Sequence, residues 1–449
     1  MNVIHVRQGR DIKLAGPARQ EIHDTGIPDR VAIQPPDFPG LRLRLLVRED
    51  DQVKVGTPLF EDKTNPKIKI VSPASGRVSA INRGEKRALL EVVVEADGSQ
   101  QALARQRYSA DEVSRLSRED LVEALLEGGF WPCIRQRPFS NVAHPSDVPK
   151  SIFVQAINTE PLALDVDVVL RDRQEEFQFG LDVLRKLTKG DVHVCFSSQA
   201  QAKALTEAKN VKTHGVEGPH PAGNVSTLVH FIDPINKGDI VWYLRAEDVL
   251  RIAPLLLEGT FSPEKYAAVT GEGAQNRVYK KTIIGAPILY LLEKQNLAGY
   301  RCISGSVLAG KNVGANGFLC FYDSQVTVIP EGGKREFLGW LSLGFNKYSF
   351  SRTFLSSVTG QKEISLDADR HGDHRAIVLN HIYDDYVPLD IPVYFLLRAV
   401  IAGDIEEAEK LGILECDEED FALCTFACPS KTDVGGIIRN GLQLIEREG

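Results

Sequence analysis

In the middle of the chain, residues 151–196 read SIFVQAINTEPLALDVDVVLRDRQEEFQFGLDVLRKLTKGDVHVCF. The two ends of this stretch, Ser151–Ile157 and Val192–Phe196, are short apolar runs, as expected of parallel strands buried on both faces. Gln174–Leu187, between them, has the apolar spacing of a helix. A strand, a helix and a second strand at this spacing predict a βαβ unit, and with it a Rossmann-like α/β domain over residues 101–255.

The other regions have different patterns. Residues 1–100 contain short Val, Ile and Leu runs separated by Gly and Pro, which predicts a β domain. Residues 256–335 return to short strands around one helical piece, and residues 336–449 contain several helices. The 449 residues, at roughly 150 per domain, agree with a multidomain α/β protein.

Composition narrows the functional class. Lys+Arg number 53 against 61 Asp+Glu, so the net charge of −8 argues against a nucleic-acid partner. Seven cysteines, an odd number spread over a long chain, indicate reduced thiols in a cytoplasmic protein. The longest apolar stretch, Ile391–Ala402, is far short of the roughly 20 residues of a membrane span and contains Arg398. A protein of this sequence that works at a membrane would be held there by a partner.

A first candidate for chemistry is the hairpin around Lys63. The segment from Leu46 to Val78 resembles a biotinyl/lipoyl hammerhead domain, in which an exposed turn carries the modified lysine. That family has Met-Lys-Met or Asp-Lys-Ala around its lysine, whereas this chain has Asp62-Lys63-Thr64. The flanks favour a fold retained without the swinging arm, and a carrier lysine remains the alternative.

A second candidate is the glycine loop GPHPAG, which contains Gly218, His220 and Gly223 and precedes a predicted helix. Backbone N–H groups in front of a helix can bind a phosphate. The chain nevertheless has neither G-x-G-x-x-G nor G-x-x-x-x-G-K-[ST] at this place. A structural turn is the favoured interpretation, with nucleotide binding as the alternative.

A third candidate is the pair Cys424 and Cys428, followed by Pro429. The spacing C-x3-C-P is the second half of a bacterial ferredoxin motif, whose two earlier ligands would fall on Glu418 and Phe421. Because a cluster needs four ligands, two cysteines sharing a buried helix face are favoured over an iron–sulfur site.

Several longer stretches identify a family better than any single motif. They are SPASGRVSAINRGEKRALLEVVVE (72–95), GPHPAG (218–223), ISGSVLAG (303–310), FLGWLSLGFNKYSFSRTFL (337–355) and DEEDFALCTFACPSK (417–431). With them, the chain resembles the NqrA family, the A subunits of the sodium-translocating NADH:quinone reductases (Na+-NQR), over essentially its full length. That family is similar to the flavin-binding subunit of complex I and to the ferredoxin-linked Rnf subunit.

The resemblance implies the domain types. It implies a biotinyl/lipoyl-like domain (1–100), a Rossmann-like domain (101–255), a β-grasp SLBB domain (256–335) and a C-terminal mainly helical domain (336–449) derived from an iron–sulfur domain. It also implies that this chain has no catalytic, cofactor or metal residues of its own. FAD, FMN, riboflavin and iron–sulfur centres are expected in sister subunits.

The resemblance further implies a place and a partner. The expected position is peripheral, on the cytoplasmic face of the bacterial inner membrane, docked on the membrane-embedded B subunit of a pump that couples NADH oxidation by ubiquinone to sodium export. The aromatic residues Trp340, Phe345 and Tyr348 are expected at a core or an interface, with a quinone site as the alternative. Two other functional classes remain as alternatives to a cofactor-free subunit. They are a lipoyl or biotinyl carrier protein and an independent flavin- or nucleotide-binding oxidoreductase.

Overall fold

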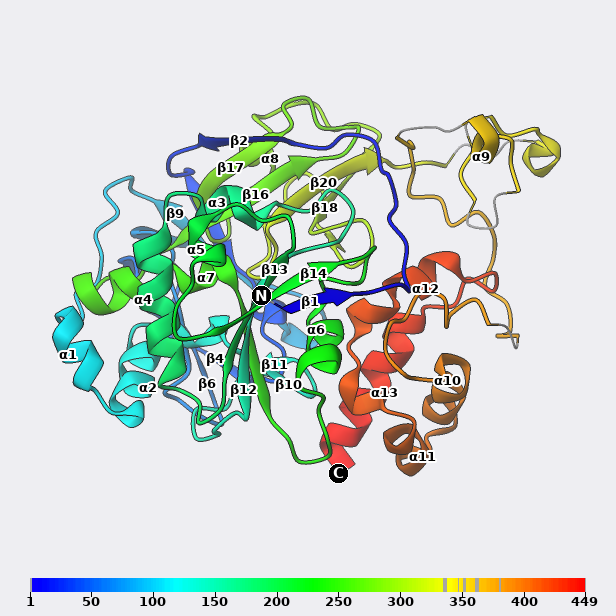
Figure 1. The fold of residues 1–449 in the computed structure, drawn as a ribbon. Helices are drawn as coiled ribbons and strands as arrows, with labels where there is room; N and C mark the ends of the chain where they lie inside the picture. The colour runs from blue at the N-terminus through cyan, green and yellow to red at the C-terminus, as the bar shows by residue number, and fades with distance from the viewer. Residues whose placement is uncertain are drawn as a thin grey trace.

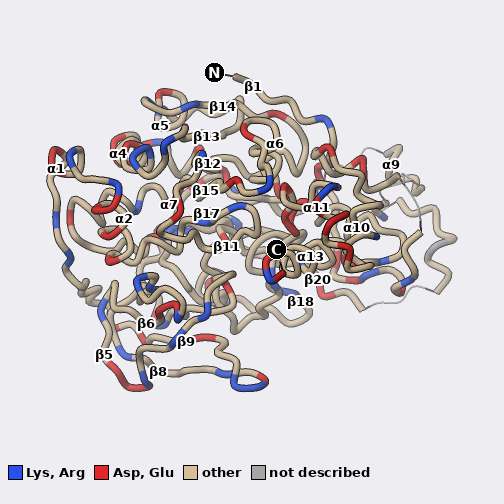
Figure 2. Tube along the Cα trace, turned by 90° about the horizontal axis from the view of Figure 1, so that it is seen from below, with Lys and Arg blue, Asp and Glu red and all other residues tan. Residues whose placement is uncertain are grey.

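The computed structural model describes residues 2–333, 337–345, 347–349, 353–359, 363–378 and 381–448, without the side chains of Trp340 and Thr359. Figure 1 shows a body built of several sheets, with the C-terminal helices packed on one side and the segment around α9 extending away from the body. Figure 2 shows basic and acidic residues interspersed along the chain.

A seven-stranded sheet forms the centre of the α/β region, in the order β1-β14-β13-β12-β15-β10-β11. Its first five strands are parallel neighbours, while β10 runs antiparallel to both β15 and β11. The predicted strand–helix–strand unit is confirmed, because β12 and β13 pair in parallel and α4 connects them. The strands are β1 (Asn2–His5), β10 (Arg135–Arg137), β11 (Asn141–Val142), β12 (Ser151–Ala156), β13 (Val192–Ser197), β14 (Lys212–Glu217) and β15 (Val241–Arg245).

Three of the helices around this sheet begin at a residue whose side chain accepts a backbone hydrogen bond from the first turn. Ser117 accepts a hydrogen bond from the Asp120 N–H while Asp120 bonds back to the Ser117 N–H, a capping box that starts α2. Ser109 and Glu112 form the same arrangement at α1. The helices here are α1 (Ala110–Arg115), α2 (Arg118–Glu127), α3 (Val166–Leu170), α4 (Gln174–Arg185), α5 (Lys203–Thr206), α6 (Val225–Ile232), α7 (Ala246–Val249) and a π-helix (Pro254–Glu258).

Two small antiparallel sheets form the N-terminal β domain. One has the order β3-β9-β8-β5 and the other β4-β6-β7, and Val31, Leu59, Phe60 and Val92 are buried between their strands. The strands are β3 (Arg30–Ile33), β4 (Leu43–Leu45), β5 (Gln52–Val53), β6 (Pro58–Asp62), β7 (Lys69–Val71), β8 (Gly76–Arg83) and β9 (Leu89–Ala96).

The first 24 residues depart from the expected domain pattern. β1 pairs with β14 of the central sheet, and β2 (Arg19–Asp24) pairs with β17 of a third sheet, so neither joins the N-terminal β domain in which the sequence placed them. A strand pattern specifies which face is buried but not which distant strand it will pair with. Here β1 covers an edge of the parallel sheet that would otherwise leave N–H and C=O groups unpaired.

The third sheet is mixed and has the order β19-β18-β20-β16-β17-β2. Its helix α8 (Ile288–Leu291) packs Ile288 and Leu291 into a core with Val269 and Val326. The remaining strands are β16 (Glu264–Thr270), β17 (Val278–Ile283), β18 (Tyr300–Ser304), β19 (Lys311–Asn312) and β20 (Gln325–Pro330).

The C-terminal helices have their own core, in which Leu396, Phe421, Cys424 and Ile438 are fully buried. The helices expected within residues 336–449 are confirmed, and α10 and α13 are the longest of those that the structure describes there. The elements are α9 (Ser356–Thr359), α10 (Val393–Ala402), α11 (Ile405–Lys410), α12 (Ala422–Ala427), α13 (Val434–Glu448) and the 3-10 turns η5 (Gly339–Leu341), η6 (Ile413–Glu415) and η7 (Glu418–Phe421).

Candidate functional site

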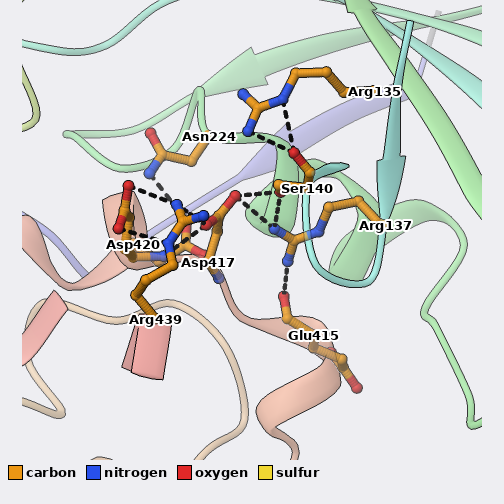
Figure 3. Close-up of polar contacts among 9 residues, drawn as sticks. Arg135, Arg137, Ser140, Asn224, Glu415, Asp417, Asp420 and Arg439 are labelled. Carbon is orange, nitrogen blue, oxygen red and sulfur yellow. Dashed lines mark hydrogen bonds and ion pairs between the residues drawn. The ribbon is translucent and has the colours of Figure 1, made fainter. Parts of the chain in front are cut away.

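A group of buried charges lies where the C-terminal segment 413–421 meets the central sheet (Figure 3). On one side of this segment is the end of β10, with Arg137 and the nearby Ser140. On its other side is α6, whose preceding residue Asn224 and last-turn His230 bond to Asp420 and Glu415. The segment therefore joins two elements of the α/β region to the C-terminal helices.

Asp417 and Arg137 form the central ion pair. Arg137 Nη1 lies 3.0 Å from Asp417 Oδ2, and the two side chains are 1% and 5% exposed. Arg137 also donates to the Glu415 carbonyl oxygen at 2.7 Å, and the Ser140 hydroxyl donates to Asp417. Burial acts to raise the pKa of the Asp417 carboxyl. The neighbouring Arg137 guanidinium outweighs this effect and holds that pKa below its usual value. The pair is therefore ionised, and losing one member would leave a buried charge without its partner.

Asp420 lies at the start of α6. Its Oδ1 accepts a hydrogen bond of 3.0 Å from Asn224 Nδ2, and Asn224 is the N-cap residue of that helix. Its Oδ2 accepts the Asp417 N–H at 2.7 Å, which closes a capping box at η7. Burial, with the nearby Asp417 carboxylate, raises the pKa of Asp420, although the Arg137 guanidinium and the hydrogen bonds from Ser226 and Asn224 act to lower it. The Asp420 side chain occupies the surroundings in which a glycine loop and a helix would receive a phosphate.

Glu419, like Asp420, has a raised pKa. Burial, and then the nearby carboxylates of Asp417, Asp420 and Glu160, raise the pKa of Glu419 to about 8. Glu160 follows β12, and its Oε1 accepts a hydrogen bond of 2.6 Å from the Ser306 hydroxyl, just beyond β18. At neutral pH Glu419 therefore carries a proton, so the junction can hold and release one proton.

The glycine loop 218–223 is tied down by the protein itself. The Gly223 N–H donates to Thr159 Oγ1 at 3.0 Å and the His220 N–H donates to Asp11 Oδ1 at 3.0 Å. Gly218 has φ +144, and an added Cβ there would lie 2.4 Å from the carbonyl oxygen of Val6. These contacts give Gly218, His220 and Gly223 a packing role beside the N-terminal segment.

His220 is the buried member of that loop. Its side chain is 2% exposed and its Nδ1 lies 3.2 Å from Thr159 Oγ1. Burial lowers the pKa of His220. The ring is therefore neutral at physiological pH and positions the loop by a single hydrogen bond.

Lys63 directly follows β6 and is exposed in the turn before β7, as the hammerhead pattern predicts. Its N–H donates to the Arg42 carbonyl oxygen at 2.8 Å. The Asp62 side chain is buried and accepts the Asn65 N–H at 2.8 Å. The backbone of this turn is therefore fixed, while the lysine side chain faces solvent.

Cys424 and Cys428 are both fully buried, in and just after α12. Cys424 Sγ donates to the Tyr383 carbonyl oxygen at 3.7 Å, and Cys428 Sγ lies 3.0 Å from the Tyr383 hydroxyl. Burial raises the pKa of the Cys424 thiol well above its usual value. For Cys428 burial acts in the same sense, but hydrogen bonds from Tyr383 and Thr432 lower the pKa of its thiol. The two cysteines thus share Tyr383 within the helical core.

The three aromatic residues predicted at a core or interface lie in the segment around η5. Phe345 is 54% exposed, and Tyr348 is half-buried, with its ring stacked 6.1 Å from that of Phe426. Trp340 belongs to η5, and its side chain lies outside the described part of the structure. Large exposed apolar side chains surround them, at Phe337, Leu341, Leu343 and Val358.

Metal ligands and membrane-spanning helices are both missing from the described part of the chain. Among the residues that the structure describes, no three His, Cys, Asp or Glu side chains gather in a way that could hold a metal ion. Over the same residues, no helix combines the length and the apolar character needed to cross a bilayer.

The ion-pair residues were not singled out from the sequence as a site. Asp417-Glu-Glu-Asp420 stood out only as part of DEEDFALCTFACPSK (417–431), a stretch shared with a family. A signal was present, since four consecutive acidic residues directly before an apolar helical run are unusual unless cations neutralise them. The partner residues, however, lie far away along the chain, as the Ser140–Asp417 bond across 277 positions shows.

The fold is a multidomain α/β scaffold. It consists of a barrel-like β domain, a largely parallel α/β sheet, a mixed sheet and the docked C-terminal helices, and a buried ion pair joins these helices to the α/β sheet. Three family models match it: the NqrA N-terminal barrel-sandwich hybrid domain (residues 4–97), the NqrA second alpha/beta domain (116–261) and the NQRA C-terminal domain (267–315). The chain belongs to the NqrA family, the A subunits of the Na(+)-translocating NADH-quinone reductase, which is a multisubunit oxidoreductase.

Curated relatives of that name match from end to end. The A subunits of this reductase from Yersinia pseudotuberculosis serotype I (strain IP32953) and Histophilus somni (strain 2336) are each 40% identical, over 451 and 449 aligned residues, covering 100% of both chains. That of Haemophilus influenzae (strain PittGG) is 39% identical with the same coverage. Among solved structures, an NAD+-reducing [NiFe]-hydrogenase in the air-oxidized state aligns with 50% of this chain and with 49% of the hydrogenase chain. The TM-score is 0.32 and the sequence identity is 14%, so this likeness is too weak to carry an argument.

Proposed function

We propose that this chain is a peripheral, cofactor-free component of the Na+-translocating NADH-quinone reductase, bound at the cytoplasmic face of the bacterial inner membrane on the membrane-embedded B subunit. In this role it organises the complex, while FAD, FMN, riboflavin and the iron–sulfur centres belong to sister subunits. Its α/β domain is Rossmann-like in descent and its C-terminal helices descend from an iron–sulfur domain. We also propose that the domain boundaries lie near residues 100, 255 and 335. The strands β1 and β2 are excepted, because they pair with strands of other domains.

One observation carries the cofactor-free role. The N-terminus of α6, the helix that follows the glycine loop, lies against the Asp420 side chain, which Asn224 holds at 3.0 Å. The loop in front of it uses its His220 and Gly223 N–H groups for Asp11 and Thr159. A phosphate entering at this loop would find these N–H groups already bonded and Asp420 beside the start of the helix.

The docking role rests on the segment around η5 and α9. Phe337, Leu341, Leu343 and Val358 are 93%, 62%, 65% and 81% exposed. Exposed apolar side chains gathered in one segment indicate a surface that another protein covers. This segment extends from the body in Figure 1, which leaves it accessible to a membrane-embedded partner. Phe345 and Tyr348 then belong to the interface, and ubiquinone would approach this chain there, at the boundary with the B subunit.

The test of docking uses the whole complex. A Leu341→Glu/Leu343→Glu variant should lower the amount of this chain that purifies with the B subunit, because buried unpaired carboxylates are costly at an interface. The matched control is Phe395→Glu, which changes an apolar side chain that is 58% exposed on α10. Normal copurification of the Leu341/Leu343 variant would rule out this segment as the docking surface.

The cofactor-free role needs a separate measurement on the isolated chain. An absorption spectrum should show no flavin or iron–sulfur bands. Stoichiometric bound flavin would favour an independent oxidoreductase, and a lipoyl or biotinyl mass increment at Lys63 would favour a carrier protein.

A further inference from the structure

A cavity of about 550 Å³ opens where three parts of the chain meet. The N-terminal β domain contributes Val55, Gln100 and Ala102, and the end of β2 with the turn after it contributes Asp24, Gly26 and Ile27. The β16–β17 pair, with the connection before it, contributes residues 260–264 and 281–283. The volume falls in the range of roughly 300–1,000 Å³ that is usual for small-molecule sites. None of these residues belongs to the ion-pair junction or to the docking segment.

The wall of the cavity is largely apolar. Phe261, Val55 and Ile283 line it and are themselves at most 8% exposed as residues. Their positions are set by the cores of the two domains, because all three belong to the same buried cluster. The cavity thus has a preformed surface suited to a flat apolar molecule.

Two polar atoms of this wall lack partners. Gln100 Oε1 and Thr282 Oγ1 are both buried, and neither finds a hydrogen-bond partner among the residues that the structure describes. Such atoms are rare in folded proteins and call for an explanation. Gln100 also has φ +49, a left-handed conformation uncommon outside glycine. Because both atoms are buried in the wall, binding would require rotation about the side-chain torsions of Gln100 and Thr282 to turn these groups toward an occupant. The Gln100 amide could then present either its oxygen or its nitrogen.

The lysine in the cavity lining is already paired. Lys281 Nζ lies 2.9 Å from Glu264 Oε2, and Arg173 Nη1 lies 2.9 Å from Glu264 Oε1. Asp24 adds a second carboxylate to the lining, so one lysine faces two acidic residues. This balance disfavours an anionic ligand such as a nucleotide phosphate.

We propose that this cavity binds an uncharged heteroaromatic molecule with an amide-like edge, of nucleobase or nucleoside size. A glutamine side chain can pair in a bidentate manner with a neighbouring donor and acceptor on such a ring. Thr282 provides one further hydrogen bond, and the apolar wall with Phe261 contacts the ring. Because Lys281 at the rim is already paired with Glu264, a neutral ligand is favoured over its phosphorylated form.

The test is titration of the full-length chain with adenosine and uridine, followed by ligand-observed NMR and calorimetry. At least one of the two should bind with Kd below about 5 mM, and AMP or UMP should bind at least about tenfold more weakly than the matching nucleoside. If adenosine binds, purine riboside, which lacks only the 6-amino donor, should bind more weakly than adenosine. The proposal is overturned if neither nucleoside binds, or if the nucleotide binds as well as its nucleoside.

Variants locate the binding. Gln100→Ala and Thr282→Val should each weaken it several-fold, and Ala102→Phe should abolish it by filling the cavity. Asn210→Ala is the matched control, because Asn210 is also an amide residue with positive φ but lines a different surface cavity. Thermal unfolding of each variant shows that it is folded. Binding that survives all three cavity variants, or that Asn210→Ala removes equally, places the ligand elsewhere and refutes the assignment.

Discussion

Replacing Asp417 by asparagine removes the negative charge from a buried pair and leaves the Arg137 guanidinium in place. The two side chains are 5% and 1% exposed, so water cannot take over the role of the carboxylate. Breaking a buried pair in this way costs about 3–5 kcal/mol. Arg137 keeps the Glu415 carbonyl at 2.7 Å and the Ser140 hydroxyl at 3.0 Å, and we therefore expect the lower end of that range, about 3 kcal/mol.

Hydrogen exchange is the appropriate assay, because a chain with several domains need not unfold in one step. The loss of protection should concentrate in α13 and η7, the elements that the junction attaches to the sheet, while the N-terminal β domain keeps its protection. The matched control is Arg77→Met, which removes exposed pairs with Asp50 at 2.6 Å and Glu95 at 2.9 Å and should leave the protection almost unchanged.

A double variant separates the pair from its surroundings. Arg137→Met with Asp417→Leu should recover much of the lost protection, because replacing a whole buried ion pair by apolar residues is often close to neutral. If Asp417→Asn alone costs no more than the Arg77→Met control, the junction does not hold the C-terminal helices on the sheet, and the reasoning is refuted.

Three further outcomes are expected. The pKa of Glu419 is raised to about 8, so between pH 4.5 and about 8 the folded state keeps a proton that the unfolded state has lost. Stability should therefore fall as pH rises through this range, by at most about 1.4 kcal/mol per pH unit. In a series of urea unfolding measurements, Glu419→Gln should flatten that fall. Cys424→Ala should be milder than Cys424→Ser in thermal unfolding, because a buried hydroxyl left unpaired costs about 1–3 kcal/mol, and stoichiometric iron lost on Cys428→Ser would contradict the packing role. Lys63→Ala should change the unfolding free energy by no more than about 0.5 kcal/mol, and intact mass should show no lipoyl or biotinyl group on the unmodified chain.

Local elements were predictable because their causes lie within a few residues. The capping box of Ser117 and Asp120 at the start of α2 is a contact between residues three positions apart. The apolar runs at residues 151–157 and 192–196 are parallel strands of the central sheet, as their patterns indicated. The exposed turn at Lys63 likewise follows from the strands on either side of it.

The candidate site was not predictable in the same way. Asp417 meets Ser140 across 277 positions, and Asn224 meets Asp420 across 196. No spacing rule connects residues so far apart, and each of them taken singly is an ordinary polar residue. Family resemblance marked the stretch 417–431 without indicating which residues it touches.

By itself, the sequence determined the helices, the strands, the order of the β, α/β, mixed and helical regions, and the family, since these depend on short-range periodicity, caps and characteristic stretches. Only the tertiary structure decided that β1 and β2 leave the N-terminal domain to pair with β14 and β17, and that the Asp420 carboxylate occupies the start of α6. The physical reason is that burial and long-range pairing depend on which surfaces meet. A strand edge or a carboxylate acquires its partner only when the whole chain has packed.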